Sequence, residues 1–414
     1  MKFKLIHYMK PFIALFLLVF MISAVSCKKD PEGPKQPKPI YLPEKAGEVI
    51  AGSNGFGIDL FRVTALQEDG NLMLSPLSAG TALTMLLNGC NTQTYVQIRD
   101  MLGYEGLTLD EINSTYRSLI EQLLAVDPEV QLALANAVWY RQDFLVKQTF
   151  LEVMDSSFES QIGALDFSQP SALETINKWA SDNTNGKIPK VLEEIEPDMV
   201  MFLMNALYFK GTWTYQFETN QTAIDPFHLE NGSAVNVDMM RSLIPVKMYS
   251  GNGAAAVELP YGRQNFSMVI ILPDNSLGEY LTDFDKADWS SITAALDAIT
   301  EPGEAEMIVP KFKFDYEKYL NDQLKTLGMM DAFDPYLADL SGISDSDIYV
   351  DFVKQNTYVD VNEEGTEAAA VTTIGIKEVS MPPSFTVDKP FIFAIRERTT
   401  NTLLFIGKVE NPTY

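Results

Sequence analysis

The chain has 414 residues, of which 46% are hydrophobic, so there is enough apolar material for a large core. It carries 56 acidic and 31 basic side chains, and the formal charge of −25 at pH 7 argues against a nucleic-acid partner. The length would allow two or three domains. However, no Pro- or Gly-rich linker interrupts the chain after about residue 44, so one large domain is equally compatible with the sequence.

Residues 1–26 have the plan of a secretory signal, with lysines ahead of an apolar run (12–25) and small residues before Cys27. The run is too short, and charged on only one flank, to favour a permanent membrane span. Residues 24–27, Ala-Val-Ser-Cys, resemble a relaxed bacterial lipobox, in which the Cys becomes the acylated first residue of the mature chain. We therefore expect an exported lipoprotein of the outer membrane, facing the periplasm or the cell surface, with plain secretion as the alternative.

The Pro- and charge-rich residues 28–43 predict an extended tether of up to about 50 Å, at roughly 3.1 Å per residue. The only other cysteine is Cys90. If Cys27 is lipidated, no disulfide can form, and we expect Cys90 to be a small buried side chain. The predicted parts are thus a signal (1–26), a lipidated tether (27–43) and a folded remainder.

Hydrophobic periodicity predicts the elements of that remainder. Ser75-Pro76 is a typical helix start. The acidic helix at 110–124 has Arg117 as its only basic residue, so we expect no heparin site on it. The predicted helices are 43–69, 77–87, 110–124, 172–183, about 277–298 and 317–327. The predicted strands are 131–140, 200–209, a hairpin at 255–272, then 306–314, 348–361, 385–396 and 403–409.

Residues 366–379 contain one Gly and no Pro, unlike an ordinary loop, and Pro382-Pro383 then end any hydrogen-bonded run. With a period of two, one face is small at its start and larger and apolar at its end: Thr366, Ala368, Ala370, Thr372, Ile374 and Ile376. Such a segment can pair as a strand wherever a sheet has a gap. A helix or an exposed loop is the alternative, because Glu-Ala-Ala-Ala is also a good helix start.

Residues 363–369, Glu-Glu-Gly-Thr-Glu-Ala-Ala, resemble the hinge of the serpin family. Further blocks of resemblance follow in family order: Ser75-Pro-Leu-Ser78, residues 184–188, Asn205 to Trp213, Asp388 to Phe391 and Leu404 to Pro412. The resemblance implies an α+β serpin fold with three β-sheets, a large central sheet and about eight to nine helices. It implies a single domain over 44–414 and an exposed reactive-centre loop at about 363–383.

The resemblance also implies a serine protease inhibitor that acts as a suicide substrate. The target cleaves the loop, which then inserts into the central sheet with the acylated enzyme attached. The implied hinge comprises Glu363, Gly365, Thr366, Glu367, Ala368, Ala369 and Ala370. The family's register places the cleaved bond between Val379 and Ser380, with Lys377 as the other candidate for the acyl side. Because Val suits a shallow apolar pocket, we expect an elastase-like target.

In the family a buried polar cluster supports the central sheet, and the resemblance assigns Ser75, Ser78, Asn205, Trp213 and Gln355 to this region. Gln355 stands where many serpins have a His. An amide both donates and accepts hydrogen bonds, so we expect the cluster to keep its geometry.

Catalysis has little support in the sequence. The only histidines are His7, which leaves with the signal, and His228, which has no nucleophile motif beside it. One His and one free Cys do not make a zinc site, and no phosphate loop is present. We expect a monomer that is not an enzyme, needs no cofactor and meets a membrane only through its lipid. The alternative is a non-inhibitory serpin, a carrier or chaperone.

Overall fold

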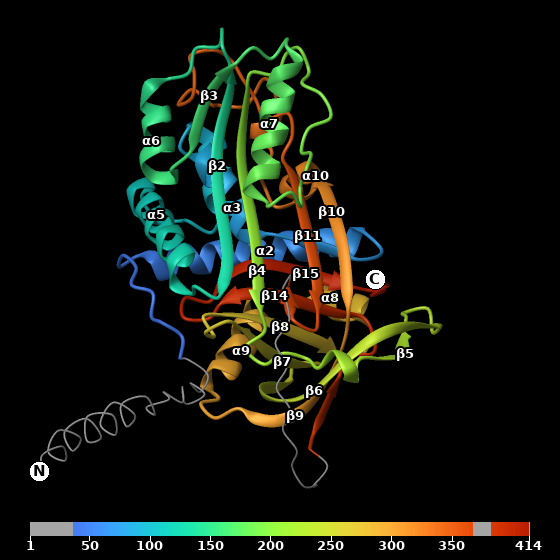
Figure 1. Cartoon of the computed structure of the whole chain (residues 1–414). Helices are drawn as coiled ribbons and strands as arrows, with labels where there is room; N and C mark the ends of the chain where they lie inside the picture. The colour runs from blue at the N-terminus through green and yellow to red at the C-terminus, as the bar shows by residue number, and fades with distance from the viewer. Residues whose placement is uncertain (1–35, 367–381, 414) are drawn as a thin grey trace, which may run out of the picture. The chain divides into compact units, whose positions relative to one another are not determined.

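The computed structural model of the chain describes residues 36–366 and 382–413 (Figure 1). The helices in these residues are α2 (Ala46–Gln67), α3 (Pro76–Leu87), α4 (Thr92–Met101), α5 (Leu109–Val126), α6 (Gln148–Phe158), α7 (Pro170–Asn183), α8 (Leu277–Asp283), α9 (Lys286–Ala298) and α10 (Asn321–Thr326). None of these described helices has both the length and the hydropathy needed to cross a membrane.

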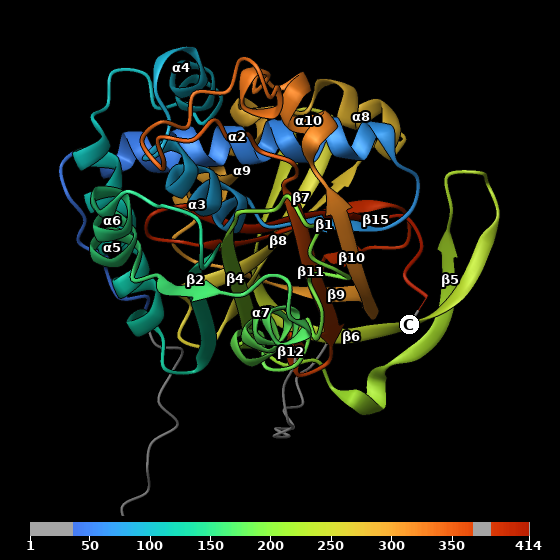
Figure 2. The same cartoon turned by 90° about the horizontal axis from the view of Figure 1, so that it is seen from above.

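The described strands form two hydrogen-bonded sheets. One sheet has six strands in the order β10 (Phe312–Tyr319), β11 (Lys354–Asn362), β12 (Gly365–Thr366), β4 (Met201–Thr212), β2 (Val130–Arg141) and β3 (Gln161–Leu165). Figure 2 shows α7 on one face of this sheet, with α2 and α3 on the other. Helix α3 is buried along almost its whole length. It begins at Ser75, whose hydroxyl accepts the N–H of Ser78 at 3.2 Å.

The other sheet has nine strands, with β5 (Ala223–His228) paired to β6. Its main path is β1 (Leu72–Leu74), β15 (Thr402–Val409), β14 (Phe391–Glu397), β8 (Phe266–Pro273), β7 (Ala254–Tyr261), β6 (Ala234–Gly251), β9 (Gly303–Pro310) and β13 (Ser384–Thr386). Strand β6 pairs with β9 through its middle and with β7 through its last residues. Two of the three expected sheets are therefore continuous through this one long strand.

The structure confirms the predicted serpin fold, and most predicted elements agree with it to within a few residues. Three predictions were wrong in part. The single strand at 306–314 is two strands, because the chain crosses from one sheet to the other at Lys311. Residues 317–319 are the end of β10, not a helix, since their pairing with β11 outweighs the helix propensity of Glu and Lys. The strand predicted to begin at 348 begins at Lys354.

The segment before α2 lies against the domain. The side chain of Asn265 accepts the N–H of Lys38 at 2.9 Å and donates to its carbonyl at 2.8 Å. Gln122 of α5 holds Tyr41 in the same way, at 2.9 and 2.6 Å. Both amides replace water around a backbone that has no sheet partner. This part of the expected tether is therefore docked on the domain.

Candidate functional site

The six-stranded sheet has an incomplete position between β4 and β11. At one end the two residues of β12 pair on both sides, Thr366 with Gly211 of β4 and with Val361 of β11. Beyond Thr366 none of the described residues fills the space, and no described ladder joins β4 directly to β11. We call this space, from β12 to the start of β4 at Met201, the seam. Since β12 is antiparallel to both neighbours, a strand that continued from it along the seam would also be antiparallel to both.

The hinge end of the seam, where β12 lies, is held by aromatic side chains. Thr366 is 5% exposed, and its hydroxyl oxygen lies 2.8 Å from that of Tyr261. The Tyr261 ring stacks on Trp213 with centroids 4.3 Å apart. Trp213 donates its indole N–H to the carbonyl of Asn362 at 3.0 Å and its backbone N–H to that of Glu364 at 2.9 Å. The point where β12 enters the sheet is thus fixed by directional contacts.

Gly365 meets a steric requirement at the same place. Its φ is +148°, a conformation that side chains rarely adopt, and a Cβ there would lie 2.1 Å from the carbonyl oxygen of Gly211. The hinge glycine is therefore needed for the close approach of β12 to β4.

Two acidic residues precede this glycine in different environments. Glu363 is buried, accepts a hydrogen bond from Thr222 at 2.8 Å and lies 3.2 Å from the ammonium of Lys311. Burial acts to raise the pKa of Glu363, but the hydrogen bonds from Thr222 and Lys311 outweigh it and hold the pKa below its usual value. Burial and the nearby charge of Glu363 raise the pKa of Glu364. Ionisation of the Glu363 carboxyl therefore strengthens its contacts, whereas ionisation of the Glu364 carboxyl disfavours its position in the folded structure.

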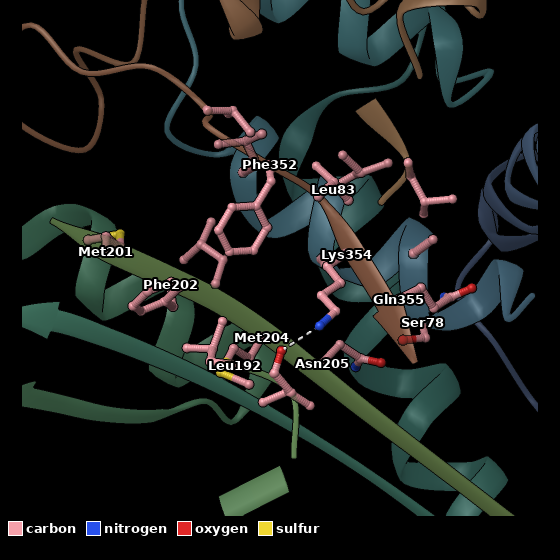
Figure 3. Close-up of a pocket in the computed structure, with 18 of the residues that line it drawn as sticks. Ser78, Leu83, Leu192, Met201, Phe202, Met204, Asn205, Phe352, Lys354 and Gln355 are labelled. Carbon is pink, nitrogen blue, oxygen red and sulfur yellow. Dashed lines mark hydrogen bonds between the residues drawn. The ribbon is translucent and has the colours of Figure 1, made fainter. Parts of the chain in front are cut away.

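The other end of the seam contains a partly open cavity of about 370 Å³. Figure 3 shows Phe202 and Met204 of β4 on one side of it, with Phe352 and Lys354 on the other. Several small or apolar side chains of α3 and α7 complete the lining, among them Ala79, Ala82, Leu83, Leu86 and Ala180. The cavity is mostly apolar and lies where a further strand of the sheet would run.

A loop that follows α7 crosses this part of the seam. Lys354 of β11 donates to the carbonyl of Val191 at 3.0 Å, the dashed line in Figure 3. The ammonium of Lys187 lies 4.7 Å from the ring centroid of Tyr358, also in β11. The loop is thus attached to one side of the seam, while α7 itself packs against β2 and β4.

Buried polar groups line the middle of the seam in two separate pairs. The Gln355 amide accepts the N–H of Ser75 and donates to its carbonyl, both at 2.9 Å. Asn205 donates to Asn136 at 2.7 Å, and Asn136 donates to the carbonyl of Phe158 at 2.7 Å. The side-chain oxygen of Asn205 is buried and accepts no hydrogen bond from the described residues. An acceptor on β4 thus lacks a donor beside the empty strand position.

The comparisons identify the family. A family model described as serpin (serine protease inhibitor) matches residues 51–412. The chain belongs to the serpin family. The leukocyte elastase inhibitor of Sus scrofa is 33% identical over 88% of this chain and 100% of its own length. The crystal structure of the thermophilic serpin tengpin in its native state has a TM-score of 0.80 at 30% identity, covering 91% of this chain and 97% of tengpin.

A serpin that binds a small molecule is also similar in structure. The complex of thyroxine-binding globulin with thyroxine has a TM-score of 0.78 at 26% identity, covering 89% of this chain and 100% of that one. Proteins similar to this chain therefore include an elastase inhibitor and a protein that binds thyroxine.

The structure brings together part of the serpin site predicted from the sequence. Gln355, Ser75, Ser78 and Asn205 line the cavity in the seam, and Glu363, Gly365, Thr366 and Trp213 meet at its hinge end. Gln355 contacts only the Ser75 side of the expected cluster, because the Asn205 amide donates to Asn136 instead. Glu367, Ala368, Ala369, Ala370, Lys377, Val379, Ser380 and Cys27 lie outside the described residues.

Sequence reasoning missed three residues of this serpin site. Asn136 is the one amide between Leu132 and Tyr140 of a mostly apolar strand, and that contrast was a usable signal. Tyr261 belongs to the predicted hairpin at 255–272, but nothing in the sequence pairs it with Thr366. Lys311 reaches Glu363 only because the chain changes sheets there.

Two other side chains have structural settings. Cys90 is buried, and burial raises the pKa of its thiol. His228 is more than half exposed at the end of β5, where its ring nitrogen Nδ1 lies 3.2 Å from the carbonyl oxygen of Asp388. Neither is placed beside the seam.

Proposed function

We propose that this serpin inhibits serine proteases as a suicide substrate, by inserting its cleaved loop into the seam. The observation that carries the proposal is the seam itself, a strand position that β12 has started to fill and that stays open along the rest of β4. Sheet addition gives main-chain hydrogen bonds along both edges of an inserted strand.

The register of β12 supports this proposal with specific pairings. Continued antiparallel to β4 and β11, it would place residue 372 between Asn205 and Gln355, and residue 376 beside Met201. Side chains at even positions would then face the same way as Thr366, which is buried. The hydroxyl of Thr372 would arrive next to the Asn205 oxygen that has no donor in the described structure.

The number of new backbone pairings gives an order of magnitude for the free energy of insertion. On the order of ten new ladder hydrogen bonds, at a net ~0.5–1.5 kcal/mol each, would contribute roughly 10 kcal/mol before burial. That is comparable with the stability of a whole domain. The uninserted form is then metastable, and inhibition is a race between insertion and hydrolysis of the acyl-enzyme.

We propose an elastase-like target, with the acyl bond at Val379. A small aliphatic side chain fits a shallow apolar pocket, and the 33% identical leukocyte elastase inhibitor is consistent with this choice. The test is gel analysis with a panel of serine proteases, in which a covalent complex should survive boiling in detergent. The released peptide should begin at Ser380, and Val379→Arg should redirect inhibition to trypsin-like enzymes. A peptide that begins at Glu378 would instead mark Lys377.

A carrier function is the second candidate, favoured by the likeness to thyroxine-binding globulin. The same gels distinguish the two functions, because a carrier would be cleaved in its loop without forming a covalent complex.

We propose further that the protein is an exported lipoprotein acylated at Cys27. The signal at 1–26 and the Ala-Val-Ser-Cys junction support this. In cells, Cys27→Ala should block processing by the lipoprotein route and change how the protein fractionates with membranes. Unchanged fractionation would contradict the anchor.

A further inference from the structure

The docked segment 38–42 fixes where the chain enters the domain. Lys38 is hydrogen-bonded to Asn265, which directly precedes β8. The first residue of β8, Phe266, pairs with Tyr261 of β7, and the hydroxyl of Tyr261 touches Thr366. The attachment point and the hinge therefore lie at the same end of one short hairpin.

The opposite end of the domain lies far from this attachment. Strand β4 runs from Thr212 beside β12 to Met201, a span of about 36 Å at about 3.3 Å per residue. In Figure 1 the blue segment before α2 starts in the lower half of the picture, where β9 lies, whereas α6 and β3 are at the top. Strand β13, where the described chain resumes after the loop, pairs with β9 at the lower end.

We propose that the docked segment orients the domain on a membrane, with the loop-bearing end toward the lipid, so that its partner is a protease acting close to that surface. Only ten residues, 28–37, separate Cys27 from Lys38, and a chain of that length reaches about 31 Å at roughly 3.1 Å per residue. This tether holds the loop-bearing end near the bilayer, and the far end points away from it. The inference rests on the proposed anchor and inhibitory function.

The orientation is tested by energy transfer. The chain without residues 1–26 is coupled through the Cys27 thiol to a maleimide lipid in phosphatidylcholine vesicles that contain an acceptor lipid. Cys90 is buried, so it does not compete for coupling. A donor dye is attached to an azide-bearing residue at one of two positions. Ser384 is exposed in β13. Asp345 has a side chain that is 93% exposed and lies 2.7 Å from Lys147, near the far end. Energy transfer to the acceptor lipid should be at least about twofold higher from position 384 than from position 345. The tether is no longer than strand β4, so it cannot bring the far end of the domain as close to the bilayer as the near end.

Two variants separate docking from tether length. Lys38→Pro with Tyr41→Pro removes the two N–H groups that dock the segment, and the ratio between the two dye positions should fall toward one. The matched control, Lys38→Ala with Tyr41→Ala, keeps both N–H groups and should keep the ratio. Equal transfer from both positions in the unaltered chain, or a ratio that the Pro pair leaves unchanged, would overturn the proposal.

The partner is tested with an elastase coupled to the same vesicles by a short linker. The form anchored at Cys27 should make covalent complex faster than a form anchored at the far end, Asp345→Cys with Cys27→Ser. Equal rates would overturn the membrane-proximal partner. If no complex forms even with soluble protease, the inhibitory function fails instead, and the transfer measurement still stands by itself.

Discussion

At its hinge end the seam is filled by Gly365 and Thr366, whereas from Asn205 to Met201 the same two flanking strands border a cavity of about 370 Å³. The hinge end is held by an aromatic stack, an ion pair and several hydrogen bonds. The cavity end has an unpaired amide oxygen and small apolar side chains. The comparison teaches that the contacts that hold the start of the strand lie at one end, while unused pairing and burial lie at the other.

The largest expected effect comes from a substitution that blocks the inserting strand at the hinge end of the seam. Thr366→Arg would place a long charged group beside Tyr261, at a cost of several kcal/mol unless it finds a partner. The charged side chain should displace Thr366's strand, β12, from the place that it already occupies in the sheet. Re-entry of β12 then becomes a costly first step of insertion, so the acyl-enzyme should have time to hydrolyse. The variant should be cleaved at a similar rate yet leave active protease and little covalent complex on gels. Thr366→Ser keeps the hydroxyl and is the control. Unchanged stoichiometry in the Arg variant would exclude trapping by insertion.

The ion pair at the hinge end should make stability depend on pH. Because the folded-state pKa of Glu363 lies below its usual 4.5, its contribution is present above about that pH and is lost as the pH falls through the lower, folded value. Glu363→Gln should cost about 1.5–3 kcal/mol at neutral pH, the range for hydrogen bonds to charged groups. Urea unfolding at pH 7 and at pH 3 measures this difference, which should shrink at the lower pH.

Glu364 provides a control of opposite sign. Its raised pKa means that ionisation disfavours the folded form, so Glu364→Gln should not destabilise the protein at pH 7. If both Gln variants lose stability equally, a general effect of charge removal at the hinge explains the result and the ion pair does not.

At the middle of the seam, Gln355→Ala should destabilise the protein by about 1–3 kcal/mol, the cost of a buried donor left unpaired. The Ser75 carbonyl would still accept the N–H of Ala79, but the Ser75 N–H would lose its acceptor. Equilibrium unfolding in urea measures the loss, and Gln355→His, which keeps an acceptor nitrogen, should recover part of it. No loss in Gln355→Ala would mean that water replaces the amide.

The smallest effect is expected from the cavity end. Ala82 lines the cavity from α3, and Ala82→Leu would add three carbons to it. At about 0.8 kcal/mol per buried carbon, the uninserted form should gain up to about 2.4 kcal/mol. The thermal unfolding temperature should therefore rise by a few degrees. The number of protease molecules inhibited per serpin molecule consumed should fall. Ala82→Ser is the control, and a lower unfolding temperature in the Leu variant would show that the space is already occupied by side-chain motion or water.

The two ends of the seam also differ in how far the sequence predicts them. Gly365 and Thr366 were predicted as hinge residues from the block at 363–369, and the alternating pattern from Thr366 indicated a strand in need of a gap. These features can be predicted from a short stretch of sequence, because strand periodicity and the need for a glycine both depend on residues that are close together in the chain. The gap itself was not predictable from spacing, since it depends on β4 and β11, which are about 150 residues apart in the chain.

The polar pairs of the seam illustrate the same limit. Gln355 was expected to join Ser75 and Asn205 in one cluster, yet its two hydrogen bonds both go to the Ser75 backbone, and Asn205 turns to Asn136. The residue types were right for a buried network, but which donor meets which acceptor depends on the distance across the open seam. Likewise, nothing in the composition of residues 28–43 indicated that Asn265 and Gln122 would hold Lys38 and Tyr41.

The stacking of Trp213 on Tyr261 has a spectroscopic consequence. Trp213 is one of four tryptophans and is 3% exposed, with its indole N–H bonded to the residue before the hinge glutamates. A strand that continued past Thr366 would change the packing and polarity around this ring first. Its fluorescence emission would therefore time the opening step without any added label, and Trp213→Phe would identify the share of the signal that comes from the hinge.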